Sequence, residues 1–242
     1  MTAWYEGPLA SFDTETTGVD VESDRIVTAA LVVQDIPGTP PAVTRWAADP
    51  GVPIPEQATA VHGLTDAWAR EHGRPPGVVA DEIARALAES ARAGRPLVVM
   101  NAPYDLTLLD RELRRHRGLP LDAYTAGHPL LVLDPWVLDK HLDRYRKGRR
   151  TLTDLCVQYG VVLDAAHDAA ADATAALRLA REIGRRHGTR LGGLTTAELH
   201  LRQAVWHAAQ ARGLEQWFAR SGTAADPVNP AWPMRGWAEE AA

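Results

Sequence analysis

Short apolar runs and turn-forming residues alternate along the first fifty residues, and this pattern predicts strands. The segment from Ile26 to Val33 is rich in β-branched and small apolar residues, which is typical of a buried strand. Residues 8–13 and 42–48 form two similar segments, and prolines or glycines separate them. We therefore expect three strands with short connections, as in an antiparallel meander.

The rest of the chain changes to helical spacing, interrupted by two more short apolar runs. Residues 97–100 and 130–133 are the expected strands, and polar residues follow each of them. Thr65 or Asp66 is a suitable cap for a short helix, and Thr195-x-x-Glu198 is a capping-box pattern. Longer helices are predicted over residues 77–93, 102–117, 151–159, 168–187 and 195–220.

This order of elements predicts an α/β fold with a mixed five-stranded sheet. The antiparallel meander is extended by parallel strands, and helices cover both faces. We expect a domain over residues 1–188, then a C-terminal helix and an irregular tail over residues 189–242. That appendage is expected to pack on the domain or to bind a partner. Its predicted apolar stripe consists of Trp206, Ala209, Leu214 and Trp217.

Composition narrows the class of protein. Hydrophobic residues make up 45% of the 242 positions, which is enough for a packed core. The single cysteine, Cys156, excludes an internal disulfide and a cysteine-based zinc site. The N-terminus does not resemble a signal peptide and no apolar run is long enough to span a membrane, so we expect a soluble cytoplasmic protein with no membrane contact.

Net charge limits how the protein could bind nucleic acid. The formal charge of −5 is unlike that of proteins that coat nucleic acid through phosphate contacts. Any such binding must therefore be local, with metal ions supplying part of the positive charge.

Asp13 and Glu15 are the first candidate site. Residues two apart in a strand point to the same face, so these carboxylates should lie side by side. Adjacent carboxylates repel unless a proton or a cation lies between them, and hard divalent cations prefer oxygen ligands. Taken alone, the pattern is more typical of an acidic strand end before a solvated turn.

Two further positions add acidic side chains near predicted strand or helix ends. Asp105 follows Asn101 in the first turn of a helix, where a carboxylate also suits the helix dipole. Asp172 lies five residues after His167, so we expect the two to share a rim of the helix but not one spot. Asp168 between them is a possible helix cap.

Together these residues suggest a metal centre. Four carboxylates from a strand and two helices can converge only if they bind cations, as in a two-metal phosphoryl-transfer site. His167 is then the natural general base for a water molecule. The side chains concerned are Asp13, Glu15, Asp105, Asp172 and His167.

The ordered set resembles the three motifs of the DEDDh 3′–5′ exonucleases. This family includes the proofreading epsilon subunit of the bacterial replicative polymerase, ribonuclease T and oligoribonuclease. The resemblance spans residues 8–187 and also includes the segments Val61-His62-Gly63-Leu64-Thr65 and Asp134-Pro135. One departure is Tyr104, where many relatives have phenylalanine.

The resemblance implies a ribonuclease-H-like fold and specific residue roles. Asp13, Glu15, Asp105 and Asp172 would ligate two Mg²⁺ or Mn²⁺ ions, with Asp13 touching both, and His167 would be the base. Glu15 would also accept a hydrogen bond from the terminal 3′-hydroxyl. The implied substrate-binding residues are Thr16, Thr17, Gly18, His62, Leu64, Asn101 and Tyr104.

A dense basic run over residues 143–150 is the last candidate site. Arg146 and Lys147 are candidate phosphate contacts, and Tyr145 offers a ring on which a base could stack. The alternative for this run is an ordinary solvated loop.

We expect a metal-dependent 3′–5′ exonuclease that releases nucleoside 5′-monophosphates from single-stranded DNA ends, in proofreading or repair. The alternatives are an exoribonuclease acting on short RNA or RNA tails, and a non-catalytic scaffold associated with a polymerase. Expected partners are single-stranded nucleic acid, DNA before RNA, and a polymerase or a second copy contacting the C-terminal helix.

Overall fold

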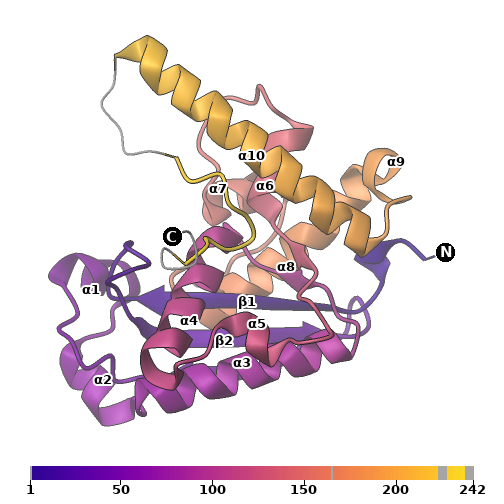
Figure 1. Ribbon diagram of the computed structural model, residues 1–242. Helices are drawn as coiled ribbons and strands as arrows, with labels where there is room; N and C mark the ends of the chain where they lie inside the picture. Colours follow the sequence, from indigo (N-terminus) through magenta and orange to yellow (C-terminus); the bar gives the residue numbers. More distant parts are fainter. Residues whose placement is uncertain (1, 165, 223–227, 238–242) are drawn as a thin grey trace.

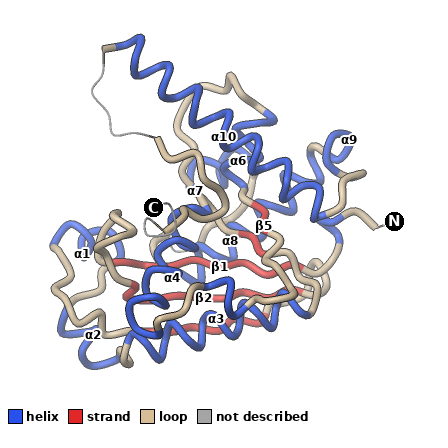
Figure 2. Tube along the Cα trace, in the orientation of Figure 1, coloured by secondary structure: helices blue, strands red, loops and turns tan. Residues whose placement is uncertain are grey.

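A five-stranded mixed sheet forms the centre of the protein. The computed structural model describes residues 2–164, 166–222 and 228–237. The strand order is β3-β2-β1-β4-β5, in which β1, β2 and β3 pair antiparallel and β1, β4 and β5 pair parallel. Figure 2 shows the strands in red, with the helices around them in blue. The strands are β1 (Leu9–Thr16), β2 (Ile26–Gln34), β3 (Ala42–Ala47), β4 (Leu97–Val98) and β5 (Val132–Leu133). The predicted sheet is therefore confirmed.

Helices cover both faces of the sheet, as predicted (Figure 1). Helices α3 and α4 pack on one face, and α8 packs on the other. After a short 3-10 turn (Trp4–Glu6), the helices are α1 (Glu56–His62), α2 (Asp66–His72), α3 (Pro76–Arg92), α4 (Ala102–Arg117), α5 (Leu121–Tyr124), α6 (Pro135–Leu142), α7 (Leu152–Tyr159), α8 (Ala169–Arg186), α9 (Gly188–Leu191) and α10 (Thr196–Ser221).

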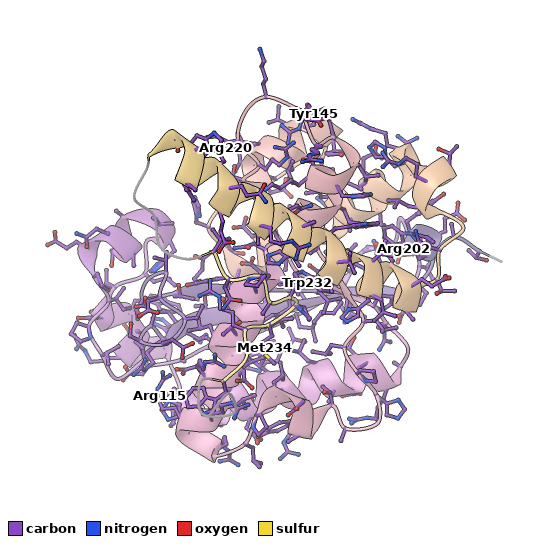
Figure 3. All side chains as sticks on the ribbon, turned by 45° about the horizontal axis from the view of Figure 1, so that its top comes forward. Arg115, Tyr145, Arg202, Arg220, Trp232 and Met234 are labelled. Atoms are coloured by element: carbon purple, nitrogen blue, oxygen red, sulfur yellow. The ribbon has the colours of Figure 1, made fainter. Side chains whose placement is uncertain are left out.

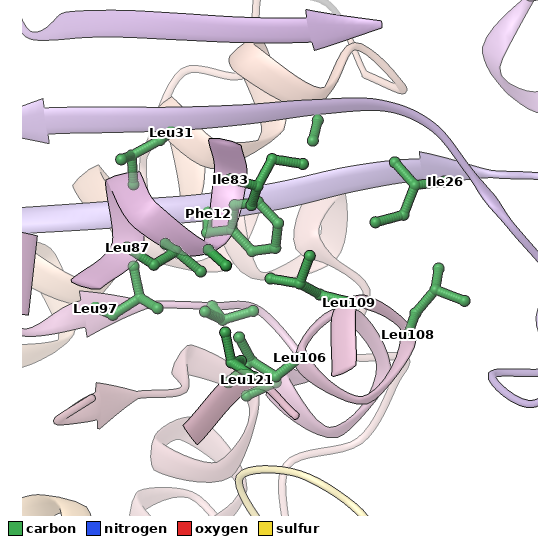
Figure 4. Packing of buried hydrophobic residues seen from close by; sticks show 14 of the residues in the cluster. Phe12, Ile26, Leu31, Ile83, Leu87, Leu97, Leu106, Leu108, Leu109 and Leu121 are labelled. Atoms are coloured by element: carbon green, nitrogen blue, oxygen red, sulfur yellow. The ribbon is translucent and has the colours of Figure 1, made fainter. Parts of the chain in front are cut away.

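Strand β1 contributes to two different environments because its side chains alternate between faces. Phe12 is fully buried and packs in the cluster that contains Ile83 of α3 and Leu109 of α4 (Figure 4). On the opposite face, Leu9 lies in the cluster of α8 side chains, which includes Ile183. The same alternation turns Asp13 toward the α8 face and away from the larger apolar core.

Several element boundaries differ from the predictions. Strand β1 continues to Thr16 instead of ending at residue 13, so the two acids lie within the strand and not in a turn after it. Strands β4 and β5 have two residues each, because Asn101 and Asp134 begin the next helices almost at once. Helices α1, α5, α6 and α9 were not predicted, and three of the four span only four to seven residues.

Helix α10 begins at the predicted capping box, in which Glu198 N donates to Thr195 Oγ1 at 3.2 Å and Thr195 N donates to the Glu198 carboxylate at 2.8 Å. The predicted apolar stripe is wrong at Ala209, which is exposed, and at Trp217, which is 52% exposed, whereas Trp206 packs partly buried against the core. The buried positions of α10 are Leu199, Gln203, His207 and Ala211.

Two of these buried positions, Gln203 and His207, are polar. Helix α10 covers the free edge of β5, where backbone groups need hydrogen-bond partners. Gln203 Nε2 donates to Val132 O at 3.0 Å, and Asp134 N donates to Gln203 Oε1 at 2.7 Å. Val132 N donates to His200 Nδ1 at 3.0 Å. Side chains of α10 thus satisfy the backbone groups that a sixth strand would otherwise pair.

The described part of the C-terminal tail, residues 228–237, has no regular secondary structure and returns from α10 toward α4 (Figure 1). Residues 223–227 and 238–242, which the predicted irregular tail also includes, lie outside the described residues. The domain boundary at residue 188 stays a prediction. No helix among the described residues combines the length and the apolar character needed to cross a bilayer.

Candidate active site

Four acidic side chains meet near the carboxyl end of β1. Asp13 and Glu15 come from β1, Asp105 from the first turn of α4 and Asp172 from the first turn of α8. Burial raises the pKa of Asp13 well above its usual value, and the charges of Asp105, Asp172 and Glu15 raise that pKa further. The structure therefore brings together the four carboxylates that the sequence motifs singled out.

His167 completes this cluster at its exposed side. Glu15, His167 and Asp172 each offer one potential ligand atom, and these three atoms lie within 4.8 Å of one another. His167 N donates to Asp172 Oδ2 at 3.1 Å. The expectation that His167 and Asp172 would not share one spot is wrong, because His167 precedes the helix and its left-handed backbone (φ 67°) turns it back toward Asp172. Asp168 caps α8, as its position suggested, by accepting from Ala171 N at 2.9 Å.

Asp105 is held by a residue that the motif analysis did not include. Thr14 Oγ1 donates to Asp105 Oδ1 at 2.7 Å, and both side chains are buried. Burial raises the pKa of Asp105 to about 7, although the hydrogen bond from Thr14 opposes that increase. Strand alternation could have identified Thr14, because it places this residue opposite Asp13 and Glu15, on the face that α4 covers.

The electrostatics of the cluster favour a cation. Burial raises the pKa of Glu15 to about 8, and the charges of Asp172 and Asp105 contribute to this shift. The pKa of Asp172 is also raised, first by burial. Asp172 Oδ1 is buried and accepts no hydrogen bond from the described residues. Carboxylates that are desolvated, close together and partly unsatisfied are the oxygen ligands that hard divalent cations prefer, so these residues fit a metal centre.

A pocket of about 360 Å³ adjoins the cluster. Glu15 and His167 form part of its lining, together with His62, the last residue of α1, and Leu64 in the connection to α2. Leu64 N donates to His62 Nδ1 at 3.0 Å, so the ring carries its proton on Nε2, which lies 3.2 Å from Thr16 O. Burial lowers the pKa of His62, which favours the neutral ring.

Comparison with known proteins shows which family the chain belongs to. The model of the RNase T exonuclease family matches residues 11–180, which include all four carboxylates and His167. The chain belongs to this exonuclease family. It is therefore a member of a family of phosphodiester hydrolases, and the resemblance seen in its motifs is confirmed.

Two curated relatives carry polymerase names. A DNA polymerase III subunit epsilon-like protein of Rhodobacter capsulatus is 36% identical over 110 residues, which cover 42% of this chain and 14% of the relative. A DNA polymerase III subunit epsilon of Treponema pallidum is 29% identical over 166 residues, which cover 66% of this chain and 68% of the relative. The chain thus matches only a small part of the Rhodobacter protein.

Solved structures of exonuclease I share the fold. The enzyme of Methylocaldum szegediense superposes with a TM-score of 0.66 at 21% identity, over 84% of this chain and 45% of that chain. Exonuclease I of E. coli in complex with a dT13 oligonucleotide gives a TM-score of 0.61 at 20% identity, over 76% and 42%. The exonuclease described here therefore spans less than half of either solved chain.

The segment after β1 is fixed by side-chain contacts in this exonuclease. Gly18 O lies within hydrogen-bond reach of two hydroxyls, those of Thr16 (2.7 Å) and Tyr104, and these two hydroxyls also contact each other. The hydroxyl that distinguishes Tyr104 from phenylalanine thus holds the turn. Thr17 Oγ1 donates to Asp24 Oδ1 at 2.7 Å, and a Cβ at Gly18 would lie 2.5 Å from Asp24 Oδ2, so a larger residue here would displace the Asp24 side chain.

The two basic candidates differ in their surroundings. Arg146 Nη2 donates to Oδ2 of the buried Asp139 at 2.9 Å, and Arg150 Nε donates to the same oxygen at 2.7 Å. Arg146 therefore anchors its loop to the protein interior. Lys147 is exposed, and Tyr145 beside it is 86% exposed at the tip of the loop (Figure 3).

Asp134 is a second position whose role the motifs did not reveal. Its carboxylate is fully buried at the end of β5, and it accepts Asn101 N at 3.1 Å and Ala102 N at 3.0 Å. Asn101 itself is exposed, with a left-handed backbone. Burial raises the pKa of Asp134 while these hydrogen bonds oppose the increase. Asp134 thus fixes the N-terminus of α4, which begins at Ala102, three residues before Asp105.

Proposed function

We propose that this exonuclease removes nucleotides from the 3′ end of single-stranded DNA, using divalent metal ions, and releases nucleoside 5′-monophosphates. The observation that carries the proposal is the convergence of four buried or half-buried carboxylates with one exposed histidine near the carboxyl end of the central strand β1. The fold shared with an exonuclease I bound to a dT13 oligonucleotide supports DNA as the substrate.

The metal ligands follow from the donor set. Asp13, Glu15, Asp105 and Asp172 would hold two Mg²⁺ or Mn²⁺ ions, with Asp13 contributing to both. Such ions polarise the scissile phosphate and lower the pKa of a water molecule when they are bound. Only deprotonated carboxylates bind a cation in this way. Cation binding should therefore release protons from carboxyl groups whose pKa values are raised, such as those of Glu15 and Asp105.

His167 is the proposed general base. Its imidazole is exposed and lies beside Glu15 and Asp172, where it can take a proton from the attacking water molecule and pass it to solvent. The hydrogen bond from His167 N to Asp172 fixes the backbone that carries the imidazole. A loss of this bond would therefore displace both a metal ligand and the base.

The terminal nucleotide is proposed to bind beside the turn after β1. Backbone groups of Thr16, Thr17 and Gly18 approach it, and Glu15 accepts a hydrogen bond from its 3′-hydroxyl. The side chains of His62, Leu64, Asn101 and Tyr104 line the remaining sides. Farther away, Lys147 contacts a phosphate of the strand, and Arg146 assists mainly by holding that loop in place.

A polymerase is the proposed protein partner. Two relatives are named as polymerase III epsilon or epsilon-like proteins, which supports this choice. Helix α10 carries exposed apolar residues that suit a protein contact: Leu201, Val205 and Trp217.

An end-labelled oligonucleotide tests the proposed activity. With Mn²⁺, a 5′-labelled single-stranded DNA should shorten one nucleotide at a time, and a 3′-labelled one should release labelled mononucleotide at once. Asp172→Asn should lower the rate by about 10³-fold or more. The matched control is Asp164→Asn, an exposed acid in the segment before α8, which should leave the rate unchanged.

An RNA oligonucleotide of the same sequence separates DNA from RNA specificity, because the 2′-hydroxyl is the physical difference between them. Intact DNA in the presence of Mn²⁺, with no mononucleotide released, would rule out the proposal. Activity retained by Asp172→Asn would rule out the metal mechanism.

A further inference from the structure

The C-terminal tail lies along α4, the helix that carries Asp105 (Figure 3). Arg235 N donates to Thr107 Oγ1 at 2.9 Å, and Arg111 Nη2 donates to Gly236 O at 2.8 Å. The Arg111 guanidinium also lies 4.8 Å from the centre of the Trp237 ring. Thr107 and Arg111 are one helical turn apart, so the tail follows one side of α4.

The tail also reaches the beginning of α4 through a buried carboxylate. Trp232 Nε1 donates to Asp134 Oδ2 at 3.3 Å, and the same oxygen accepts Ala102 N at 3.0 Å. The other oxygen, Oδ1, accepts Asn101 N at 3.1 Å and Trp136 N at 2.9 Å. Val137 N also donates to Oδ1, at 3.5 Å. Among the described residues, Trp232 is the one side-chain donor to this carboxylate, since the other donors are backbone groups at the beginnings of α4 and α6.

The N-terminus of α4 depends on its hydrogen bonds to the Asp134 carboxylate. Asn101 has φ 60° and ψ 51°, a left-handed conformation that residues other than glycine adopt at a cost. Among the residues that the structure describes, its N–H and that of Ala102 donate only to the Asp134 carboxylate, and Asp105 follows within the same helical turn. A shift of Asp134 would therefore move the Asp105 carboxylate relative to Asp13 and Asp172.

We propose that Trp232 is a positioning residue, which acts through Asp134 to place Asp105 for binding divalent cations. The inference rests on the proposed function, because it takes Asp105 as a metal ligand. Trp232 lies beyond residues 11–180, the part of the chain that matches the family model. The tail would thus complete the metal centre of the exonuclease from outside the region that defines the family.

The first test compares Trp232→Phe with wild type by calorimetric titration of metal-free protein with MnCl₂. The substitution keeps most of the buried ring and removes the Nε1–H donor. We expect Mn²⁺ binding to weaken about 3- to 10-fold, since one hydrogen bond to a buried carboxylate is lost. Trp217→Phe, at an exposed position of α10, is the matched control and should bind Mn²⁺ like wild type.

Turnover gives a second measure. Trp232→Phe should lower kcat at limiting Mn²⁺ without changing KM for the oligonucleotide, and saturating Mn²⁺ should restore kcat. A side chain that only stabilised the fold would change the melting temperature but would not shift the Mn²⁺ dependence of the folded protein.

Thr107→Val keeps the test decisive if Trp232→Phe does not fold. It removes the hydroxyl that accepts Arg235 N, and it should also weaken Mn²⁺ binding. Wild-type Mn²⁺ affinity in the folded variant would overturn the proposal. Wild-type protein that binds Mn²⁺ but cleaves no DNA would instead contradict the proposed nuclease activity, so the two failures are distinguishable.

Discussion

Single hydrogen bonds orient the carboxylates of this exonuclease, and Thr14 supplies the clearest case. Thr14→Val has nearly the same shape but cannot donate to Asp105. A hydrogen bond to a charged group contributes about 1.5–3 kcal/mol, so we expect a 10- to 100-fold lower kcat/KM in the oligonucleotide assay. Thr44→Val, at an exposed position of β3, should change kcat/KM less than twofold. Equal activity of the two variants would contradict this role of Thr14.

The raised pKa of Glu15 makes stability depend on pH. The pKa of Glu15 is about 8 in the folded protein and near 4.5 in the unfolded chain, so the folded state binds more protons between these values. The contribution of Glu15 to the stability of the metal-free protein should therefore be greatest below pH 4.5. It should decrease as the pH rises to about 8.

Glu15→Gln removes that ionisation. In EDTA at pH 8.5, we expect the variant to melt about 2–8 °C above wild type, because roughly 1–2 kcal/mol of desolvation cost and charge repulsion at Glu15 is removed. Added Mn²⁺ should reverse the order, because only wild type keeps all four ligands. Differential scanning fluorimetry across pH 5 to 9 measures both effects. If the melting temperatures of the two proteins changed with pH in the same way, ionised Glu15 would not destabilise the metal-free protein.

Much of the site could be predicted at this scale. Strand alternation correctly placed Asp13 beside Glu15, and the same rule would have identified Thr14. The contact between His167 and Asp172 could not be predicted from helical geometry, because it depends on a left-handed turn at a residue other than glycine. No spacing rule gives that conformation.

Among the elements, α10 shows how an edge strand is protected by side chains. Gln203 is fully buried and bonds the backbone on both sides of Leu133. Gln203→Ala should lower the free energy of unfolding by about 2–4 kcal/mol, since it leaves two buried backbone groups unpaired. Chemical denaturation measures this loss, and Gln216→Ala on the exposed part of α10 is its control. A loss below 0.5 kcal/mol would mean that α10 does not protect β5.

Elements with strong terminal signals were predictable, and those held by tertiary contacts were not. Thr151 and Thr195 form the capping boxes that begin α7 and α10, and Asp168 caps α8. The stripe of α10 was predicted wrongly because apolar residues usually face the core, whereas this helix faces unpaired backbone groups at a sheet edge. That requirement becomes visible only when β5 is known to be an edge strand.

At the scale of the whole molecule, an acidic protein must confine its contacts with DNA to small basic areas. Lys147 is exposed on the loop between α6 and α7, whereas Arg146 is bonded to buried Asp139. Lys147→Ala should weaken DNA binding at every sequence and reduce the slope of log affinity against log salt by about 0.7–1. Fluorescence anisotropy from 50 to 300 mM salt measures this slope.

Arg146→Ala provides the contrast. It should lower the free energy of unfolding by about 1–3 kcal/mol, because Asp139 loses one of two guanidinium partners. An unchanged salt slope in Lys147→Ala would show that the loop does not contact phosphates.

The overall fold followed from the order of strands and helices, and the site followed from the order of its motifs. The return of the tail could not be foreseen, because the bond between Trp232 and Asp134 joins residues 98 positions apart in a segment without regular pattern. Contacts of that kind depend on the finished fold and leave no local signal.

The central claim is that one cluster of side chains holds the metal ions. Anomalous diffraction from crystals grown with Mn²⁺ and a nucleoside 5′-monophosphate tests it most directly. We predict two peaks about 4 Å apart, with Asp13 bound to both and Glu15, Asp105 and Asp172 completing the ligands. Manganese peaks elsewhere, or none at these carboxylates, would contradict the account.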